Sequence, residues 1–380
     1  MQTVGVICEY NPFHLGHKKQ LDMIRAQYGS DTAIVCLMSG NFVQRGHPAV
    51  FDKMHRAEAA LRSGADLVLE LPVTYALSSA EGFAAGGVSV LSKFCDALCF
   101  GAETADAELL MKAANALLSP EFTTALRRHL DAGLSFPAAR QAAFADLGLD
   151  GAILKTPNNI LAVEYCKAVL AQCSAMAVMP IHRCGSYHNT DADSEDPSAT
   201  AVRKLITGGG DWKCFVPVAA QDALSSASTH TLAAGEKAIL AKLRTMTDAE
   251  FEALPYGSEG LWRKLMHASR KEATLEAILT ATKSKRYTRT RLDRMVMCAF
   301  LGITAEDLRS HAPYARILAF NGRGRAVLNA QKESGFLHNI GEDTRHPYQA
   351  LEQRTTALYG LFTDNPEAPD AEENYRVIVM

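Results

Sequence analysis

The sequence lacks the long apolar segments and the cysteine patterns that mark several classes of protein. Its longest apolar runs, such as residues 65–73, contain acidic side chains and fall far short of the roughly 20 residues that a helix needs to cross a bilayer. Its nine cysteines include no CxxC pair, which excludes the usual spacing of a metal site or a disulfide framework. Several lie in apolar, strand-like runs, where a reduced thiol behaves as a small hydrophobic side chain. We therefore expect a cytoplasmic protein with no membrane partner and no metal site of its own.

An excess of charge of one sign is also missing from the chain as a whole. The 380 residues carry 39 basic and 42 acidic side chains, whereas proteins that coat nucleic acids are strongly basic. The average hides an uneven distribution, because residues 261–330 carry 14 basic and 5 acidic side chains. Within them, residues 283–291 combine five basic side chains and a tyrosine with no acid. Such a run is commonly a solvated helical face, but it also predicts a local site for a polyanion.

What the sequence does contain is a regular alternation of short apolar runs and helical patterns. Short strands that alternate with helices of ten or more residues are typical of βαβ units and a parallel sheet. We therefore expect an α/β fold with a doubly wound parallel sheet. The predicted strands are 3–9, 32–38, 67–71 and 96–100, and the predicted helices are 16–28, 52–63 and about 78–93.

The pattern also predicts two domains, which suits the length of the chain. Residues 1–218 are expected to form the α/β domain, with a helical insertion rich in Ala and Leu at about 106–150. A further strand at 177–181 and a short helix at 197–206 would complete it. Residues 219–380 repeat Ala, Leu, Lys and Glu at a helical period and predict a mainly α-helical second domain, which contains the basic run.

The stretch Glu9–His17, which reads EYNPFHLGH, follows the first predicted strand and opens the first predicted helix. A helix N-terminus at the carboxyl end of a parallel strand offers free N–H groups to an anion. His14 and His17 are three residues apart, so both imidazoles can project to one side of the first turn and donate hydrogen bonds to a phosphate. They could also form half of a metal site with Cys8 or Glu9, or be ordinary capping or surface histidines. A Walker loop and a GxGxxG turn are absent here, which weighs against kinases and dinucleotide-binding enzymes.

An HxGH loop after the first strand resembles the nucleotidyltransferase superfamily that shares its core with class I aminoacyl-tRNA synthetases. In that group the histidines steady the α-phosphate of ATP while pyrophosphate leaves. Further segments narrow the resemblance to the bacterial tRNA(Met) cytidine acetate ligase family, over roughly residues 4–295. They are MSG at 38–40, QRG at 44–46, DLV at 66–68, ELP at 70–72, PNNIL at 157–161, SAT at 198–200 and KRYT at 285–288. The KMSKS-type signature of the synthetases is not present.

This resemblance implies a two-step reaction on acetate. Members of the family activate acetate with ATP to acetyl-adenylate, releasing pyrophosphate, and pass the acetyl group to N4 of the wobble cytidine of elongator tRNA(Met), forming N4-acetylcytidine. The partners would be ATP, acetate and this tRNA, with Mg²⁺ expected from the ATP chemistry. Two alternatives stay open: a metabolic adenylyltransferase that acts on a small phosphorylated substrate, and a non-catalytic RNA-binding protein. The former is typically a much smaller protein, and the intact histidine pair weighs against the latter.

The resemblance also assigns residues to roles, with His14 and His17 at the transition state. Gly101 could instead simply end a strand, Asn158 and Asn159 could cap a helix, and Ser198 could be an N-cap. Arg183 could be a surface salt-bridge residue, and Arg45 could contact substrate or RNA or serve solubility. The implied ATP pocket is Ile7, Cys8, Glu9, Tyr10, Asn11, Pro12, Phe13, His14, Leu15, Gly16, His17, Lys18, Lys19, Gln20, Gly101, Asn158, Asn159, Arg183, Ser198, Thr200 and Arg203. The implied tRNA contacts are Lys283, Lys285, Arg286, Arg289 and Arg291.

Overall fold

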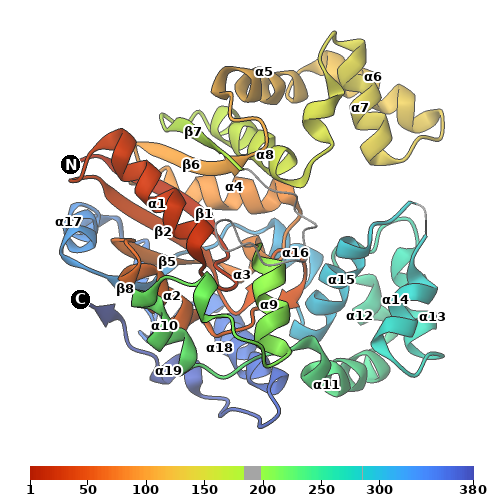
Figure 1. Cartoon of the computed structure of the whole chain (residues 1–380). Helices are drawn as coiled ribbons and strands as arrows, with labels where there is room; N and C mark the ends of the chain where they lie inside the picture. The colour runs from red at the N-terminus through yellow and green to blue at the C-terminus, as the bar shows by residue number, and fades with distance from the viewer. Residues whose placement is uncertain (184–197, 285) are drawn as a thin grey trace.

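A mostly parallel sheet forms the centre of the molecule (Figure 1). The structure is a computed structural model that describes residues 1–183, 198–284 and 286–380, without the side chain of Glu333, so Lys285 of the basic run lies outside it. Within these residues the strand order is β10-β8-β5-β2-β1-β6-β7, with β9 beside β8. The predicted α/β fold is confirmed. The first five strands of this sheet along the chain are β1 (Thr3–Cys8), β2 (Ala33–Ser39), β5 (Leu67–Leu71), β6 (Ala97–Ala102) and β7 (Ala177–His182).

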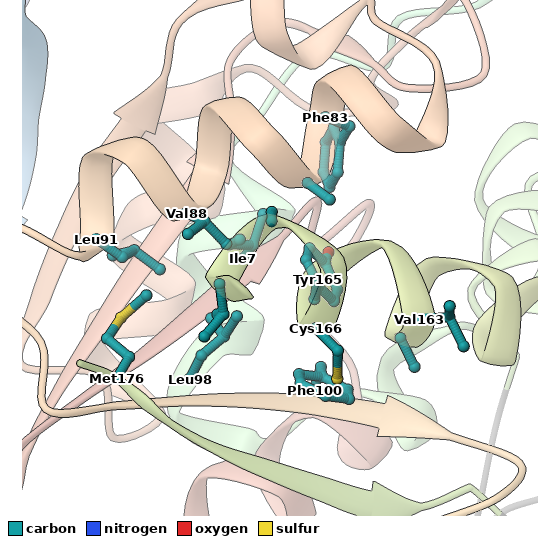
Figure 2. Close-up of a cluster of buried hydrophobic side chains, with 14 of the residues drawn as sticks. Ile7, Phe83, Val88, Leu91, Leu98, Phe100, Val163, Tyr165, Cys166 and Met176 are labelled. Atoms are coloured by element: carbon teal, nitrogen blue, oxygen red, sulfur yellow. The ribbon is translucent and has the colours of Figure 1, made fainter. Parts of the chain in front are cut away.

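Helices cover both faces of the sheet, which is why its central strands are almost entirely apolar. All residues of β2 are buried, as expected for a parallel strand with helices above and below it. On one face, Ile7 of β1 and Leu98 of β6 pack against Phe83 and Tyr165 (Figure 2). These two belong to α4 (Ala80–Leu91) and α8 (Pro157–Ala171). The other face is covered by α1 (Leu15–Tyr28), α2 (Lys53–Arg62) and α10 (Val218–Ser225).

Two groups of helices extend from this core. The first follows β6 and consists of α5 (Ala107–Leu117), α6 (Pro120–Asp131) and α7 (Phe136–Asp146). The second has its own apolar core, which also includes Phe42 and Leu77 from the α/β part of the chain. Its helices are α11 (Leu232–Thr245), α12 (Asp248–Glu252), α13 (Leu261–Ser269), α14 (Leu275–Thr282), α15 (Arg289–Leu301) and α16 (Ala305–Arg309). The two smaller elements α3 (Val73–Ala76) and α9 (Ala199–Thr207) lie beside the sheet.

The C-terminal region returns to the sheet, which the sequence did not predict. Strand β8 (Ala315–Phe320) pairs antiparallel with β5, and β9 (Leu337–Asn339) and β10 (Ile378–Val379) pair parallel with β8. The helices between them are α17 (Gly322–Ala330), α18 (Tyr348–Tyr359) and α19 (Ala371–Asn374). The part of the chain after residue 218 is therefore mainly helical, but it also completes one edge of the central sheet.

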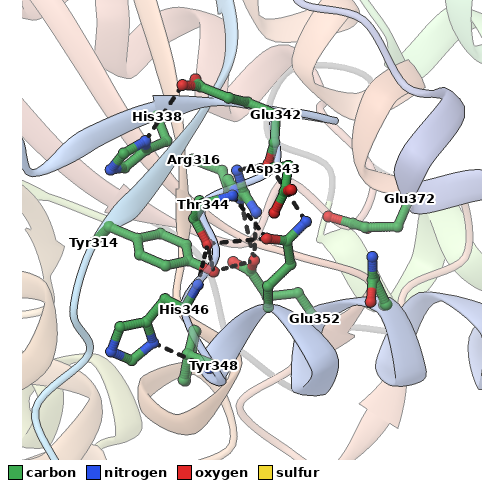
Figure 3. Close-up of polar contacts among 12 residues, drawn as sticks. Tyr314, Arg316, His338, Glu342, Asp343, Thr344, His346, Tyr348, Glu352 and Glu372 are labelled. Atoms are coloured by element: carbon green, nitrogen blue, oxygen red, sulfur yellow. Dashed lines mark hydrogen bonds and ion pairs between the residues drawn. The ribbon is translucent and has the colours of Figure 1, made fainter.

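Buried ionic groups attach this C-terminal region to the rest of the fold. Lys53 Nζ lies 2.8 Å from Glu70 Oε2 and 2.7 Å from Glu372 Oε2. Burial alone would lower the pKa of Lys53, but the carboxylates of Glu372 and Glu70 outweigh burial and raise it. Nearby, Arg316 and Tyr314 both donate to Glu352 (Figure 3). The ammonium of Lys53 thus joins α2, β5 and α19.

Removing the charge of Lys53 should destabilise the fold strongly. Lys53→Met leaves two carboxylates buried without their cation, so we expect the free energy of unfolding to fall by about 3–5 kcal/mol. The matched control is Lys242→Met, which breaks a partly exposed pair with Glu250 and should cost less than about 1 kcal/mol. Urea unfolding of both variants measures the difference. Equal losses in the two variants would show that the buried triad is not a major attachment.

Candidate active site

A cavity of about 640 Å³ opens at the carboxyl ends of β1 and β6. This volume lies within the range of small-molecule and cofactor sites. Its walls come from the loop after β1, from the hairpin of β3 (Phe42–Val43) and β4 (His47–Pro48), and from the first residues of α8, α9 and α11. A ligand there would meet several loops at one edge of a parallel sheet, the usual binding position in such folds.

The structure brings together most of the ATP residues suggested by the sequence and places some of them elsewhere. The side chain of His14 is fully buried beside the cavity and does not line it, and Asn159 also lies outside the wall. The predicted residues that line the cavity are Ile7, Cys8, Glu9, Tyr10, Asn11, His17, Gln20, Gly101, Asn158, Arg183, Ser198, Thr200 and Arg203. The predicted residues outside its wall are Pro12, Phe13, His14, Leu15, Gly16, Lys18, Lys19 and Asn159.

Backbone hydrogen bonds set the proton positions of the two histidines. His14 Nδ1 accepts from the N–H of Gly16 at 3.1 Å, and His17 Nδ1 accepts from the N–H of His14 at 3.3 Å. A neutral imidazole that accepts at Nδ1 carries its proton on Nε2. The rings are tilted by 31° with centroids 3.8 Å apart, and His14 Nε2 has no hydrogen-bond partner among the described residues. Both histidines therefore carry an Nε2–H; the ring of His17 lies at the cavity wall, and that of His14 is buried behind it.

The environment keeps both imidazoles uncharged. Burial, with smaller contributions from Arg183 and Arg203, lowers the pKa of His14 to about 3. Burial, His14 and Arg183 likewise hold the pKa of His17 well below its ordinary value. The histidines thus supply hydrogen bonds, while the positive charge beside the site is that of the arginines.

These arginines are held by the loops that the sequence singled out. Arg203 Nη1 donates to the carbonyl of Asn11 at 2.6 Å, and its Nη2 donates to Thr200 Oγ1 at 3.1 Å. A Cβ on Gly101 would lie 2.8 Å from Arg183 Cδ, so glycine leaves room for this side chain over the end of β6. Ser198 caps α9, because its Oγ accepts from the N–H of Ala201 at 3.1 Å. Ser198 is therefore both an N-cap and a residue of the cavity wall.

The two asparagines at the start of α8 have different positions. Asn158 lines the cavity and donates from Nδ2 to Glu103 Oε1 at 2.8 Å. Asn159 is buried and exchanges hydrogen bonds with Thr104, so it fixes the loop after β6. Burial would raise the pKa of Glu103, but hydrogen bonds from Thr156, Asn158 and Asn159 hold it below its usual value. Glu103 thus caps α8, a role that the sequence analysis missed.

The β3–β4 hairpin joins the cavity to the helical region. The N–H of Gln44 donates to Glu9 Oε1 at 2.8 Å, and Arg294 Nη1 donates to the carbonyl of Gln44 at 3.4 Å. Gly46 has a φ of +80°, and a Cβ there would lie 2.5 Å from the backbone of α15, so only glycine allows this contact. His47 also lines the cavity, 3.7 Å from Asp293 of α15. No motif in the sequence indicates that His47 meets a residue so far along the chain.

The basic run does not present all its charges freely. Arg289 donates to Glu276 and to Asp293, and Arg286 donates to Glu259 at 3.0 Å, with about two thirds of its side chain exposed. Arg291 instead donates to two neutral acceptors, the carbonyl of Tyr256 and Ser258 Oγ. Lys283 lies between α14 and α15 and is exposed. Arg289 therefore braces α14 against α15, and Arg286 is paired with Glu259 at the surface. Lys283 and Arg291 have no acidic hydrogen-bond partner among the described residues.

The described residues form neither a membrane-spanning helix nor a cluster of metal-binding side chains. None of the helices in this part of the chain has the length and apolar character needed to cross a bilayer. Nor do three or more His, Cys, Asp or Glu side chains of the described ranges converge as they would around a metal ion.

Comparison with known proteins extends over the whole chain. The family model of the HIGH Nucleotidyl Transferases matches residues 1–374. The tRNA(Met) cytidine acetate ligase of Clostridium acetobutylicum is 34% identical over 402 residues, with 100% of each chain covered. That of Bacillus subtilis is 33% identical over 389 residues, with 96% of this chain and 94% of the relative covered.

Solved structures give the same picture. The crystal structure of Thermotoga maritima TmcAL in its apo form matches with a TM-score of 0.91 and 30% identity. The same protein bound with alpha-thio ATP matches with a TM-score of 0.88 and 29% identity. Both matches cover 100% of both chains, so the likeness includes the helical region and the C-terminal strands.

The neutral state of the two histidines can be observed directly. Because burial opposes their protonation, we expect the ring signals of His14 and His17 to remain those of the Nε2–H tautomer from about pH 8 to about pH 5. Long-range ¹H–¹⁵N correlation spectra of histidine-labelled protein measure this, and His14→Gln and His17→Gln assign the signals. A signal of either ring that titrates near pH 6.5, the ordinary histidine value, would contradict the assignment.

Proposed function

The chain belongs to the HIGH nucleotidyltransferase family and, within it, to the tRNA(Met) cytidine acetate ligases, and from this membership we propose its reaction. It activates acetate with ATP to acetyl-adenylate and transfers the acetyl group to N4 of the wobble cytidine of elongator tRNA(Met). The observation that carries the proposal is the pair of Nε2–H donors of His14 and His17 beside two arginines. Such a site suits an anion that gains charge during the reaction.

Adenylate formation needs alignment and charge stabilisation. An acetate oxygen attacks the α-phosphorus of ATP, and the bond to pyrophosphate breaks while negative charge builds on the α-phosphate oxygens. Neutral Nε2–H groups of His14 and His17 strengthen their hydrogen bonds as this charge grows. Arg183 and Arg203 lie close enough to lower the pKa of His14, so their charge also acts on a phosphate at this position. The protein forms no covalent bond in this step.

The ATP pocket proposed here follows the cavity wall. The residues of 7–20 that face it, together with Gly101, Asn158, Arg183, Ser198, Thr200 and Arg203, contact the nucleotide. His14 lies behind the wall, with an Nε2–H that has no partner among the described residues and would be free to pair with an α-phosphate that reaches it. Mg²⁺ would arrive on the triphosphate, because the described residues offer no cluster of acidic side chains to hold it, and Mg²⁺ is commonly bound through substrate phosphates.

The tRNA approaches from the helical region. The cavity extends to His47, Thr231 and Leu232, so a cytidine base can enter from this side while the adenylate occupies the end near β1. Lys283, Lys285, Arg286 and Arg291 contact RNA phosphates, whereas Arg289 mainly braces α15. Such a protein would act in the cytoplasm on its tRNA.

Isotope exchange tests the first step. With acetate present, the protein should exchange radiolabelled pyrophosphate into ATP, and without a carboxylate it should not. His17→Ala removes a hydrogen-bond donor that stabilises the transition state, so we expect the exchange rate to fall on the order of 10²–10³-fold. The control His311→Ala changes an exposed histidine and should keep the wild-type rate. Exchange that is independent of acetate would favour an adenylyltransferase with another substrate.

The RNA contacts can be separated from the adenylation site. Lys283→Gln with Arg286→Gln should weaken tRNA binding by about tenfold or more and make binding less dependent on salt, since fewer counter-ions are released. Acetate-dependent exchange should be unchanged. The matched control, Arg325→Gln with Lys332→Gln, removes two charges near α17, on the opposite side of the molecule from α14 (Figure 1). If both double variants bind tRNA equally well, the basic run is not the RNA contact.

A further inference from the structure

We propose that Tyr287 and Arg291 form a stacking platform for an unpaired nucleotide next to the target cytidine. The proposal rests on the proposed function, because it names the part of the RNA that this surface holds. It concerns how the RNA is held beside the cavity, which is a separate question from phosphate binding by the basic run.

The platform belongs to a ladder of tyrosines and arginines. Arg291 Cζ lies 4.9 Å from the ring centroid of Tyr287, and Arg294 Cζ lies 5.0 Å from that of Tyr256. The two pairs are joined, because Arg291 Nη2 donates to the carbonyl of Tyr256 at 2.8 Å. We call Tyr287, Arg291, Tyr256 and Arg294 the tyrosine–arginine ladder. Aromatic rings and guanidinium planes are the surfaces on which proteins stack unpaired RNA bases.

The ladder ends at the cavity. Arg294 Nη1 donates to the carbonyl of Gln44, which lines the cavity, and Gly46 lies directly on the backbone of α15 at this point. Arg291 and Arg294 are three residues apart on α15, a rise of about 4.5 Å along the helix axis. The outer pair therefore lies within reach of a nucleotide adjacent to one whose base enters the cavity. An enzyme that modifies a base must take it out of the stack, which leaves its neighbours in need of new stacking partners.

Charge and order also suit this role. Arg291 donates only to neutral acceptors, and Arg294 Nε, although buried, has no partner among the described residues. Arg289, two residues before Arg291, is by contrast neutralised by Glu276 and Asp293. Tyr287 Oη donates to Glu259 Oε2 at 2.7 Å, which fixes the ring while leaving it partly accessible. The ladder is thus a prearranged cationic and aromatic surface, with the carboxylate of Glu259 bonded to its outer ring.

A thermodynamic cycle with an anticodon stem–loop of tRNA(Met) tests the platform. Tyr287→Ala should raise the KM for the intact stem–loop by about tenfold, the loss expected for one stacked base. When one of the two nucleotides flanking the cytidine is replaced by an abasic site, the KM of the wild type should rise by the same factor. The KM of Tyr287→Ala should not rise further with that RNA, because the stacked base is already missing. Tyr287→Phe, which keeps the ring and loses the bond to Glu259, should behave as wild type.

Readouts of the first step and of salt dependence complete the test. Acetate-dependent pyrophosphate exchange by Tyr287→Ala should match that of the wild type; a loss of exchange would show a structural role and overturn the proposal. If the losses from Tyr287→Ala and from the abasic site multiply at both flanking positions, the ring does not stack on either base, and the proposal is overturned. An effect of Arg291→Gln on the salt slope, without an effect of Tyr287→Ala on KM, would indicate phosphate contact without stacking and would also overturn it. Wild-type protein that exchanges pyrophosphate but does not acetylate the RNA would contradict the proposed function instead.

Discussion

The guanidinium of Arg56 holds together the two loops on which the cavity depends. It is fully buried on α2 and donates to the carbonyls of Glu9 at 2.6 Å, Phe51 at 2.9 Å and Ser39 at 3.1 Å, and also to that of Gly40. Glu9 follows β1, Ser39 is the last residue of β2, and Gly40 follows it. Burial lowers the pKa of Arg56, but a guanidinium stays charged in proteins, so several carbonyl dipoles converge on one fixed cation. The loop after β1, which carries His14 and His17, and the loop between β2 and the β3–β4 hairpin are therefore both anchored by this guanidinium.

The C-terminal region supports the same loops from the opposite side. Tyr359 Oη of α18 donates to the carbonyl of Ala49 at 2.8 Å, and Asn41 Oδ1 accepts from the N–H of Lys53 at 2.9 Å. Lys53 is itself fixed by Glu372 of α19. The strands that close the sheet edge and the helices between them are thus connected to the chain between β2 and α2. This connection gives a physical role to a region for which the sequence predicted none.

The features that the sequence predicted correctly are those that neighbouring residues in the chain determine. Strands β1, β2, β5 and β6 are almost entirely apolar runs between helices, and the HxGH loop occupies one turn, so adjacent residues are sufficient to identify them. The remaining features depend on residues that are distant in the sequence. The run at 315–320 contains Arg316, whose partner is Glu352, and its antiparallel pairing with β5 is set by tertiary contacts. Likewise, Arg289 and Arg291 look alike in sequence, and the ion pairs of Arg289 with Glu276 and Asp293 distinguish it from Arg291, which bonds to neutral acceptors.

The peptide of Gln44 links the loop after β1 to the helical region through two hydrogen bonds of different strength. Gln44 donates its N–H to the carboxylate of Glu9 at 2.8 Å, and it accepts at its carbonyl from Arg294 at 3.4 Å. Hydrogen bonds to ionised groups are roughly twice as strong as neutral ones when they are short and well aligned, and the bond from Arg294 is long. The hairpin is therefore bonded more strongly to Glu9 than to Arg294, and the close backbone contact at Gly46 holds it against α15. Loss of the Arg294 bond should disturb the residues around the cavity less than loss of the Glu9 bond, because the firmer bond lies on the nucleotide side.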